Sequence, residues 1–263
     1  EDYMPFVHKL RNGYENTVSG NLHVSVVGGN TANTEFEFLT GNTMASLPSG
    51  SVPYQQYIKS EIPSMVSWLK SIGYTTNAVH PFYASGWNRD KVYGYMGFDN
   101  TYFKDSFGDD AEIIRKYISD RSAFEKVYDI QKSCDGPSFT FLVTMQNHGG
   151  FGQSYAGFNP DVIINGTTSR FPKNYLSLMK ITDKALENFI SELSESDEKT
   201  VVVFFGDHQP NDIIVNPLLE LNKKNCDTLG QNEIYKRYEV PYIMWANFDI
   251  DEETNLDISP NYL

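Results

Sequence analysis

Short apolar runs alternate with segments of helical periodicity along the chain, and this alternation constrains the fold more than any other feature. The apolar runs, which we expect to be strands, are His23–Val27, Tyr74–Val79, Ser138–Met145, Val201–Phe205 and Val240–Trp245. Val201–Phe205 is apolar at every position, as in strands that helices cover on both faces. Such alternation is typical of an α/β sandwich with a largely parallel central sheet. Because no repeat or long linker divides the sequence, we expect a single domain over residues 1–263.

Two segments carry the 3.6-residue apolar period of an amphipathic helix. Residues 109–131 are predicted to form the first of these helices, behind a cap made by Asp109 and Asp110. Residues 174–193 are predicted to form the second. Shorter helices are predicted at residues 3–12, 31–40, 61–71 and 87–95. Together they would supply the helical layers of the sandwich.

The charge balance is strongly acidic, with 34 acidic and 21 basic residues and a net charge of −13. Nucleic-acid-binding proteins neutralise phosphates with clustered Lys and Arg, so the sequence predicts no nucleic acid as a partner. An anionic substrate would need a local cation to offset this field. The acidic residues assigned to solvated faces are Asp183, Glu187, Asp249, Asp251, Glu252 and Glu253.

The two cysteines, Cys134 and Cys226, are too few for a disulfide framework or a cysteine-based zinc site. One disulfide between them stays open at this point. The sequence contains no run of about 18 apolar residues, the length that a membrane span requires. It begins at Glu1 without a methionine, and we expect it to be a piece of a longer protein.

Polar and glycine-rich motifs follow four of the predicted strands. Catalytic and binding residues of α/β proteins gather at the carboxyl ends of strands, where loops leave the sheet. The motifs are Gly28-Gly29-Asn30-Thr31, His80, Gln146-Asn147-His148-Gly149-Gly150 and Gly206-Asp207-His208-Gln209-Pro210. Three of the five histidines of the protein lie in these motifs, so we expect the functional site at this edge of the sheet.

Asp207 and His208 are candidate ligands of a divalent metal ion. A carboxylate and an imidazole on adjacent residues at a strand end can both face one cation. Hard oxygen with borderline nitrogen suits Mn²⁺, Zn²⁺ or Mg²⁺. In the alternative interpretation, Asp207 caps a turn and His208 is merely exposed.

Thr31 lies where a glycine-rich turn enters a predicted helix. The first turn of a helix has unpaired N–H groups and a positive dipole, which favour an anion such as a phosphoryl group. A hydroxyl at that place could attack phosphorus if a metal lowered its pKa. In the alternative, Thr31 is only an N-cap and Glu35 supports the first turn.

His80, Trp87 and Arg89 form a candidate binding set for a small phosphorylated polyol. Arg89 offers a planar fork for phosphate oxygens, Trp87 a flat apolar wall and His80 a hydrogen-bond donor. In the alternative, Trp87 is buried at a helix start and Arg89 pairs with Asp90 or Asp99.

His148 is a further candidate for ligand binding. The paired glycines that follow it would let a ligand approach closely. The competing interpretation is a core histidine with satisfied hydrogen bonds.

Several motifs in a fixed order carry a resemblance to a known family. They are Thr31-Ala-Asn-Thr-Glu-Phe, His80, Trp87-Asn-Arg89-Asp, Gly-Tyr-Met-Gly-Phe-Asp99, Thr-Met-Gln-Asn-His148, Asn174-Tyr-Leu and Phe-Gly-Asp207-His208. This set resembles the extracellular sulfatase-like domain of lipoteichoic acid synthases and related phosphoglycerol transferases, of the alkaline phosphatase superfamily. The resemblance spans nearly the whole chain and implies a three-layer α/β sandwich.

The resemblance also implies an activity. Thr31 would be the nucleophile that takes glycerol phosphate from a phosphatidylglycerol head group and holds it as phosphothreonine. Asp207 and His208 would bind one divalent ion, usually manganese in this family, with Thr31 completing the set. The positions that match substrate binding are His80, Trp87, Arg89 and His148. An acceptor, either growing lipoteichoic acid or a glucan, would then displace the threonine.

The resemblance further implies an extracellular or periplasmic location, with membrane helices ahead of the sequence given. The family's remaining metal ligand is a glutamate at the end of a strand that precedes the helix near Tyr3. Glu1 follows no strand and does not take that role, so we expect weak metal binding or none. Two alternatives stay open: another enzyme of the superfamily, namely a sulfatase, phosphodiesterase or phosphoethanolamine transferase, and a non-catalytic module that binds glycerol phosphate. A threonine nucleophile argues against sulfatases, which use a modified Cys or Ser.

Overall fold

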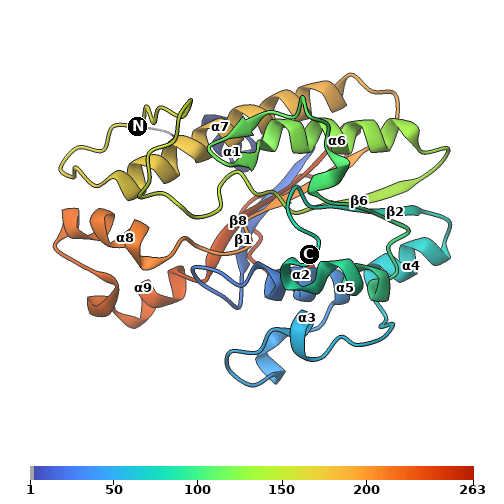
Figure 1. Ribbon diagram of the computed structural model, residues 1–263, viewed down its shortest axis with the longest axis horizontal. Coiled ribbons are helices and arrows are strands. Elements are labelled where there is room, and N and C mark those ends of the chain that lie inside the picture. The colour runs from blue at the N-terminus through green and yellow to red at the C-terminus, as the bar shows by residue number, and fades with distance from the viewer. Residues whose placement is uncertain (1–2) are drawn as a thin grey trace. The chain divides into compact units, whose positions relative to one another are not determined.

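The computed structural model describes residues 3–263, which divide into two compact units (Figure 1). The first unit contains the described residues up to Thr34 together with Gly149–Ser154 and Asn159–Leu263. The second contains Glu35–His148 and Tyr155–Phe158. The expectation about Glu1 falls outside the described residues.

An antiparallel sheet forms the centre of the first unit. Its strands are β1 (Thr17–His23), β8 (Glu239–Ala246) and β7 (Val201–Phe205), in the order β1-β8-β7. Thr17 lies opposite Trp245, and Val201 lies opposite Ala246. The predicted strand His23–Val27 is therefore displaced: the strand ends at His23, and the residues after it form the turn that leads to Thr31. β8 also runs antiparallel to Val201–Phe205, so this sheet is not part of the parallel sheet that the alternation predicts.

Helices of the first unit include α7 (Arg170–Ser194), which contains the predicted helix 174–193. The others are α1 (Pro5–Arg11), α8 (Asp212–Leu219) and α9 (Gln231–Lys236), with short 3₁₀ turns at Glu220–Asn222, Cys226–Thr228 and Pro260–Tyr262. Figure 1 shows α1 beside α7, and the two helices pack together.

Asp183 on α7 is buried, which corrects its assignment to a solvated face. Its carboxylate accepts hydrogen bonds from the backbone N–H groups of Phe6 and Val7, at 3.0 and 2.8 Å. These amides belong to the first turn of α1 and have no partner within that helix. A negative charge at this place satisfies the amides and also interacts favourably with the helix dipole. Asp183 therefore serves to fasten α1 to α7.

A parallel sheet forms the centre of the second unit, as the alternation of strands and helices predicts. Its strands are β2 (Thr75–Val79), β3 (Asn100–Tyr102) and β6 (Ser138–Leu142), in the order β3-β2-β6. Asn77 on the central strand lies opposite Asn100 on one side and Thr140 on the other. Because parallel strands end at the same edge, His80 and the segment that leads to His148 leave the sheet side by side.

The helices of the second unit differ from prediction at residues 109–131 and in a short helix that was not predicted, Pro53–Gln56. They are α2 (Thr31–Thr40, whose first turn belongs to the first unit), α3 (Pro53–Gln56), α4 (Met65–Ser71), α5 (Arg89–Met96) and α6 (Asp120–Ser133), with 3₁₀ turns at Met44–Ser46, Gly86–Asn88 and Lys104–Ser106. The predicted helix 109–131 is wrong in its first half. Strands β4 (Ile113–Ile114) and β5 (Tyr117–Ile118) form a tight hairpin there, and the cap of α6 is Ser119.

The hairpin has a physical cause that periodicity alone cannot separate from a helix. Apolar residues at 113, 114, 117 and 118 fit one helical face, but they also fit two paired strands around a two-residue turn. Arg115 in that turn has a φ of 62°, the left-handed conformation that such turns require. Contacts made by Arg115, described below, hold it there.

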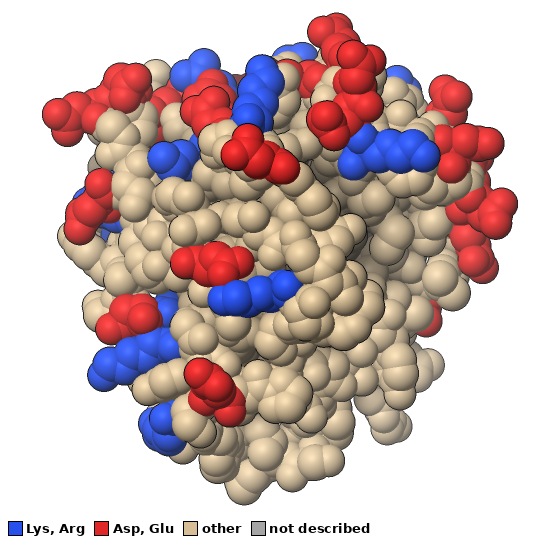
Figure 2. Space-filling view, turned by 90° about the vertical axis from the view of Figure 1, so that its right-hand side faces the viewer, with Lys and Arg blue, Asp and Glu red and all other residues tan. Residues whose placement is uncertain are grey.

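Some expectations about the whole chain are also answered. Cys134 and Cys226 are both free, so the disulfide left open does not form. Within residues 3–263, no helix is both long and apolar enough to cross a membrane. On the face drawn in Figure 2, acidic side chains gather along the upper edge and basic ones lie singly among them. That nucleic acid is not a partner stays a prediction.

Candidate active site

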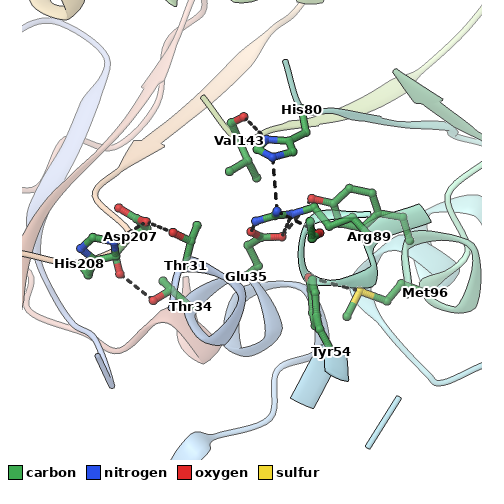
Figure 3. A network of polar contacts seen from close by, with 12 residues as sticks. Thr31, Thr34, Glu35, Tyr54, His80, Arg89, Met96, Val143, Asp207 and His208 are labelled. Atoms are coloured by element: carbon green, nitrogen blue, oxygen red, sulfur yellow. Dashed lines mark hydrogen bonds and ion pairs between the residues drawn. The ribbon is translucent and has the colours of Figure 1, made fainter. Parts of the chain in front are cut away.

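Thr31, Thr34, Asp207 and His208 form one group of polar side chains in the first unit, which we call the threonine cluster (Figure 3). Thr31 is the first residue of α2, and its Oγ1 donates a 2.6 Å hydrogen bond to Oδ2 of Asp207. Thr34, one turn along, donates to the backbone oxygen of Asp207 at 2.7 Å. Nε2 of His208 lies 3.2 Å from the same Oδ2. The hydroxyl of Thr31 therefore donates to a carboxylate, whereas the side chain of an N-cap only has to accept from a backbone N–H of its own helix.

Two glycines allow the loops of the threonine cluster to meet. Gly28 has a φ of 74°, and its N–H donates to the backbone oxygen of Gln209 at 2.9 Å. A Cβ at Gly28 would lie 2.9 Å from Cβ of Asn211, so a larger residue would push the loops apart. A Cβ at Gly206 would lie 3.0 Å from Cβ of Val240. The lack of a side chain thus lets the turn at Gly28 approach the segment after His208, and lets the chain at Gly206 approach β8.

The donor atoms of the threonine cluster fit part of a metal shell. The ring of His208 lies between two oxygens: Nδ1 is 2.9 Å from the backbone oxygen of Gln209, and Nε2 is 3.2 Å from Oδ2 of Asp207. The cluster thus offers a hydroxyl, a carboxylate and an imidazole nitrogen, a set that suits a divalent cation. No group of three or more His, Cys, Asp or Glu side chains that could hold a metal ion occurs among residues 3–263. The fit is therefore partial, with one carboxylate to balance the charge.

Arg89, Glu35, His80 and Tyr93 form a second group, in the second unit, which we call the arginine cluster (Figure 3). Both nitrogens on one edge of the Arg89 guanidinium bind Glu35: Nη2 contacts Oε1, and Nε donates to Oε2 at 3.2 Å. Tyr93 donates to Oε2 at 3.0 Å. Nη1 of Arg89 lies 3.3 Å from Nε2 of His80. Arg89 therefore pairs with Glu35, and the alternative pairing with Asp90 or Asp99 is wrong.

Burial and charge fix the protonation of the arginine cluster. Burial, together with the nearby charge of Arg89, lowers the pKa of His80 from 6.5 to about 4, so the ring is neutral at pH 7. Nδ1 of His80 lies 2.9 Å from the backbone oxygen of Val143 and so carries the proton. Burial alone would raise the pKa of Glu35, but Arg89 outweighs it and lowers that pKa. Arg89 thus stays a cation, held by a carboxylate and facing a neutral imidazole acceptor.

Trp87 lies in the 3₁₀ turn Gly86–Asn88, directly before α5. Its side chain is half-buried, so the alternative in which Trp87 is buried at a helix start is wrong. Its φ of 57° and the φ of 58° at Asn88 are both left-handed. A non-glycine residue held in this region costs about 1–3 kcal/mol and is found most often at functional sites. These two left-handed residues form a sharp turn directly before Arg89, the first residue of α5.

His148 is exposed, which excludes the interpretation as a core histidine. Its Nδ1 lies 3.1 Å from the hydroxyl of Tyr117. Nη2 of Arg115 donates to the backbone oxygens of His148 and Gln146, at 2.7 Å each. The β4–β5 hairpin therefore orients both the ring and the backbone of His148.

Besides Thr34, which lies in the motif of Thr31, four residues that build these sites were not among the sequence-based candidates: Glu35 as a partner of Arg89, and Tyr93, Arg115 and Tyr117. A signal existed for Glu35. It lies on the same stripe of α2 as Ala32 and Leu39, both fully buried, and a carboxylate on an apolar stripe requires a partner. For the other three, the sequence carries no comparable signal, because their roles depend on a hairpin and a helix packing that local pattern does not predict.

Comparison with known proteins assigns the family. The sequence model of the family described as Sulfatase matches residues 3–263. The chain belongs to the sulfatase family. A Rhizobium meliloti protein named for cyclic beta-1,2-glucan modification is 31% identical to this sulfatase-family chain over 269 residues, covering all of the chain and 40% of that protein.

Two solved structures share the fold of this sulfatase-family chain. The lipoteichoic acid synthase LtaP of Listeria monocytogenes has a TM-score of 0.81 at 24% identity, covering 99% of the chain and 64% of that structure. The phosphoglycerol transferase GacH of Streptococcus pyogenes, solved with sn-glycerol-1-phosphate, has a TM-score of 0.78 at 24% identity, covering 99% and 66%. The resemblance that the ordered motifs indicated is thereby confirmed, and so is the fold of the alkaline phosphatase superfamily. The chain spans less than half the length of its Rhizobium relative.

Proposed function

We propose that this chain is the catalytic domain, over residues 1–263, of a phosphoglycerol transferase that moves glycerol phosphate from phosphatidylglycerol to an acceptor alcohol. The observation that carries the proposal is the 2.6 Å hydrogen bond from Thr31 Oγ1 to Asp207 Oδ2 at the start of α2. A hydroxyl there meets both a carboxylate and the unpaired amides of a helix N-terminus, an arrangement that suits attack on a phosphoryl group. Membership of the sulfatase family and likeness to GacH support it.

Thr31 is the nucleophile of the proposed two-step transfer. In the first step, Oγ1 of Thr31 bonds to phosphorus while the bond from phosphorus to the diacylglycerol oxygen breaks, and the hydroxyl proton of Thr31 is balanced by the proton that diacylglycerol takes up. Asp207 orients the hydroxyl for this attack by accepting its hydrogen bond. In the second step, an acceptor hydroxyl bonds to phosphorus, loses its proton and releases Thr31.

The metal of the proposed enzyme is a divalent cation, with Mn²⁺ as the first candidate and Mg²⁺ or Zn²⁺ as alternatives. Thr31, Asp207 and His208 are the residues that would hold it. When bound, such an ion lowers the pKa of the nucleophile and offsets the charge on the phosphoryl oxygens. Nε2 of His208 and Oδ2 of Asp207 lie 3.2 Å apart, close enough for both atoms to face one ion.

The glycerol phosphate group is proposed to bind Arg89, His80, Trp87 and His148. Arg89 supplies a permanent positive charge with planar N–H geometry for phosphate oxygens. His80 is neutral and protonated on Nδ1, so its Nε2 accepts the 3.3 Å contact from Nη1 of Arg89 and would accept from a glycerol hydroxyl once the ligand takes over that contact. His148 is exposed, and the hydroxyl of Tyr117 orients its ring from the Nδ1 side, which supports a place for it at the ligand.

The proposed setting is the extracellular or periplasmic face of a bacterial membrane, where phosphatidylglycerol head groups are present. Membrane contact would come from helices outside the sequence given. The acceptor is proposed to be lipoteichoic acid or a glucan, because the relatives are named for lipoteichoic acid synthesis and for glucan modification.

The test uses the full-length protein with Mn²⁺ and vesicles that contain phosphatidylglycerol. We expect a mass increase of one glycerol phosphate on the peptide that contains Thr31, and its loss together with all turnover in Thr31→Ala. The matched control is Thr40→Ala, which removes a hydroxyl from the last turn of the same helix, where it bonds only to local groups. Labelling from phosphatidylethanolamine vesicles instead would indicate a phosphoethanolamine transferase. Unlabelled protein that still binds sn-glycerol-1-phosphate would indicate a non-catalytic module.

A further inference from the structure

Glu35 is a buried carboxylate whose partner, Arg89, lies 54 positions away in the sequence. We propose that Glu35 is a positioning residue for glycerol phosphate binding: it anchors one edge of the Arg89 guanidinium so that the other edge faces the ligand. This inference rests on the function proposed above, because it assigns a role within the binding site that Arg89 would provide.

The contacts of Arg89 are unequal on its two edges. On the Glu35 edge, Nη2 and Nε bind the two carboxylate oxygens in a paired, charge-assisted arrangement. On the opposite edge, Nη1 makes two contacts of 3.3 Å to neutral acceptors, Nε2 of His80 and the backbone oxygen of Gly86. A ligand oxygen can displace contacts to neutral acceptors more easily than the paired contacts to a carboxylate. Nη1 is therefore the nitrogen that meets the ligand.

The carboxylate of Glu35 is itself held in place. Its backbone belongs to α2, and the Tyr93 hydroxyl on α5 donates to Oε2 at 3.0 Å. Tyr93 is fully buried, and its ring meets the ring of Tyr54 edge to face. Arg89 also lies on α5, so Glu35 connects the helix that carries Arg89 to α2. A binding group gains precision when its supporting residues are fixed in this way.

An opposite effect of Glu35 is conceivable on charge alone, since a carboxylate competes with phosphate for the same guanidinium. Burial decides between the two effects. The side chains of Arg89 and Glu35 are each only 3% exposed, and a buried cation without its counter-charge is strongly disfavoured. Without the carboxylate, the guanidinium would leave its buried position. This loss of position would outweigh any gain from removing a group that competes with phosphate.

The experiment compares Glu35→Gln with Glu37→Gln. Glu37 is a matched control because it lies on the same helix, is 4% exposed, and accepts from Met44 N–H at 2.9 Å and from the Thr43 hydroxyl. The first readout is the affinity for sn-glycerol-1-phosphate by calorimetry, on folded protein verified by circular dichroism. We expect Glu35→Gln to bind at least about tenfold more weakly, and Glu37→Gln to bind as the wild type does.

The second readout needs no ligand. The Nε–H resonance of Arg89, assigned by its absence in Arg89→Lys, should be protected from exchange in wild type and in Glu37→Gln, and should lose that protection in Glu35→Gln. Should Glu35→Gln not fold, Tyr93→Phe tests the same anchor by removing one support of the carboxylate. We expect it to weaken binding severalfold and to speed exchange at Nε.

The outcomes separate the two proposals. Glu35→Gln protein that binds sn-glycerol-1-phosphate as tightly as wild type, or more tightly, overturns the positioning role. So does an Arg89 signal that is indifferent to Glu35→Gln. If wild type binds no sn-glycerol-1-phosphate while the Arg89 signal still depends on Glu35, the proposed function is overturned, whereas the anchoring of Arg89 stands.

Discussion

Acidification from pH 7 to pH 5 should destabilise this protein through one histidine, His80. Burial and the neighbouring Arg89 lower the pKa of His80 from 6.5 to about 4 in the folded state. Between these two values the unfolded chain binds a proton that the folded chain does not, so stability rises with pH across this window. The contribution is fully present above about pH 6.5 and is lost as the pH falls toward 4.

The size of the effect follows from the shift. At 1.36 kcal/mol per pKa unit, a change from 6.5 to about 4 corresponds to about 3 kcal/mol in total. At pH 5 the unfolded histidine is almost fully protonated and the folded one almost fully neutral, so about 2 kcal/mol is lost relative to pH 7. That is a substantial share of the free energy of unfolding of an ordinary domain, which is about 5–15 kcal/mol.

The assay is urea unfolding at pH 7 and pH 5 for wild type and for His80→Asn. Asparagine can keep a donor near the Val143 oxygen but does not titrate. Other groups titrate equally in both proteins, so the wild type should lose about 2 kcal/mol more than the variant over this interval. Equal losses in the two proteins, or an NMR titration of His80 with a midpoint near 6.5, would refute the reasoning.

Two further predictions concern α7 and the threonine cluster. Asp183→Asn should destabilise the protein by about 1–3 kcal/mol in urea unfolding, because one of two backbone amides loses its charged acceptor. Glu187→Gln, on the same helix but half-exposed, should change stability by less than about 0.5 kcal/mol, and equal effects of the two would contradict the helix-capping role. Residues 1–263 should bind Mn²⁺ more weakly than micromolar in calorimetry, since the threonine cluster offers a single carboxylate, and Asp207→Asn should abolish what binding there is. Micromolar or tighter binding by the unaltered chain would refute that expectation.

Much of the candidate site follows from the order of motifs and strands. The rule that functional residues follow strand ends selects Thr31, His80, His148, Asp207 and His208, and the structure places Thr31 beside Asp207 and His80 beside Arg89. Their proposed roles stay predictions. The rule works because a strand fixes where its last residue points, whatever surrounds it.

What escaped prediction depends on contacts between distant segments. The period of residues 113–118 fits both a helix and a hairpin, and the hairpin that forms contacts the distant backbone of Gln146 and His148 through Arg115. Asp183 looks like a solvated acid on an amphipathic helix until the first turn of α1 packs against it.

The sequence by itself determined the α/β class, the helices at 31–40 and 174–193 within their observed bounds, and the family, because apolar period and motif order are local properties of the chain. Only the tertiary structure decided which charges face one another. Arg89 could have paired with Asp90 or Asp99 nearby, yet it is held by Glu35, and Asp99 pairs with Lys70. A buried guanidinium such as that of Arg89 requires a counter-charge buried with it, and burial is a property of the packed protein rather than of neighbouring residues in the sequence.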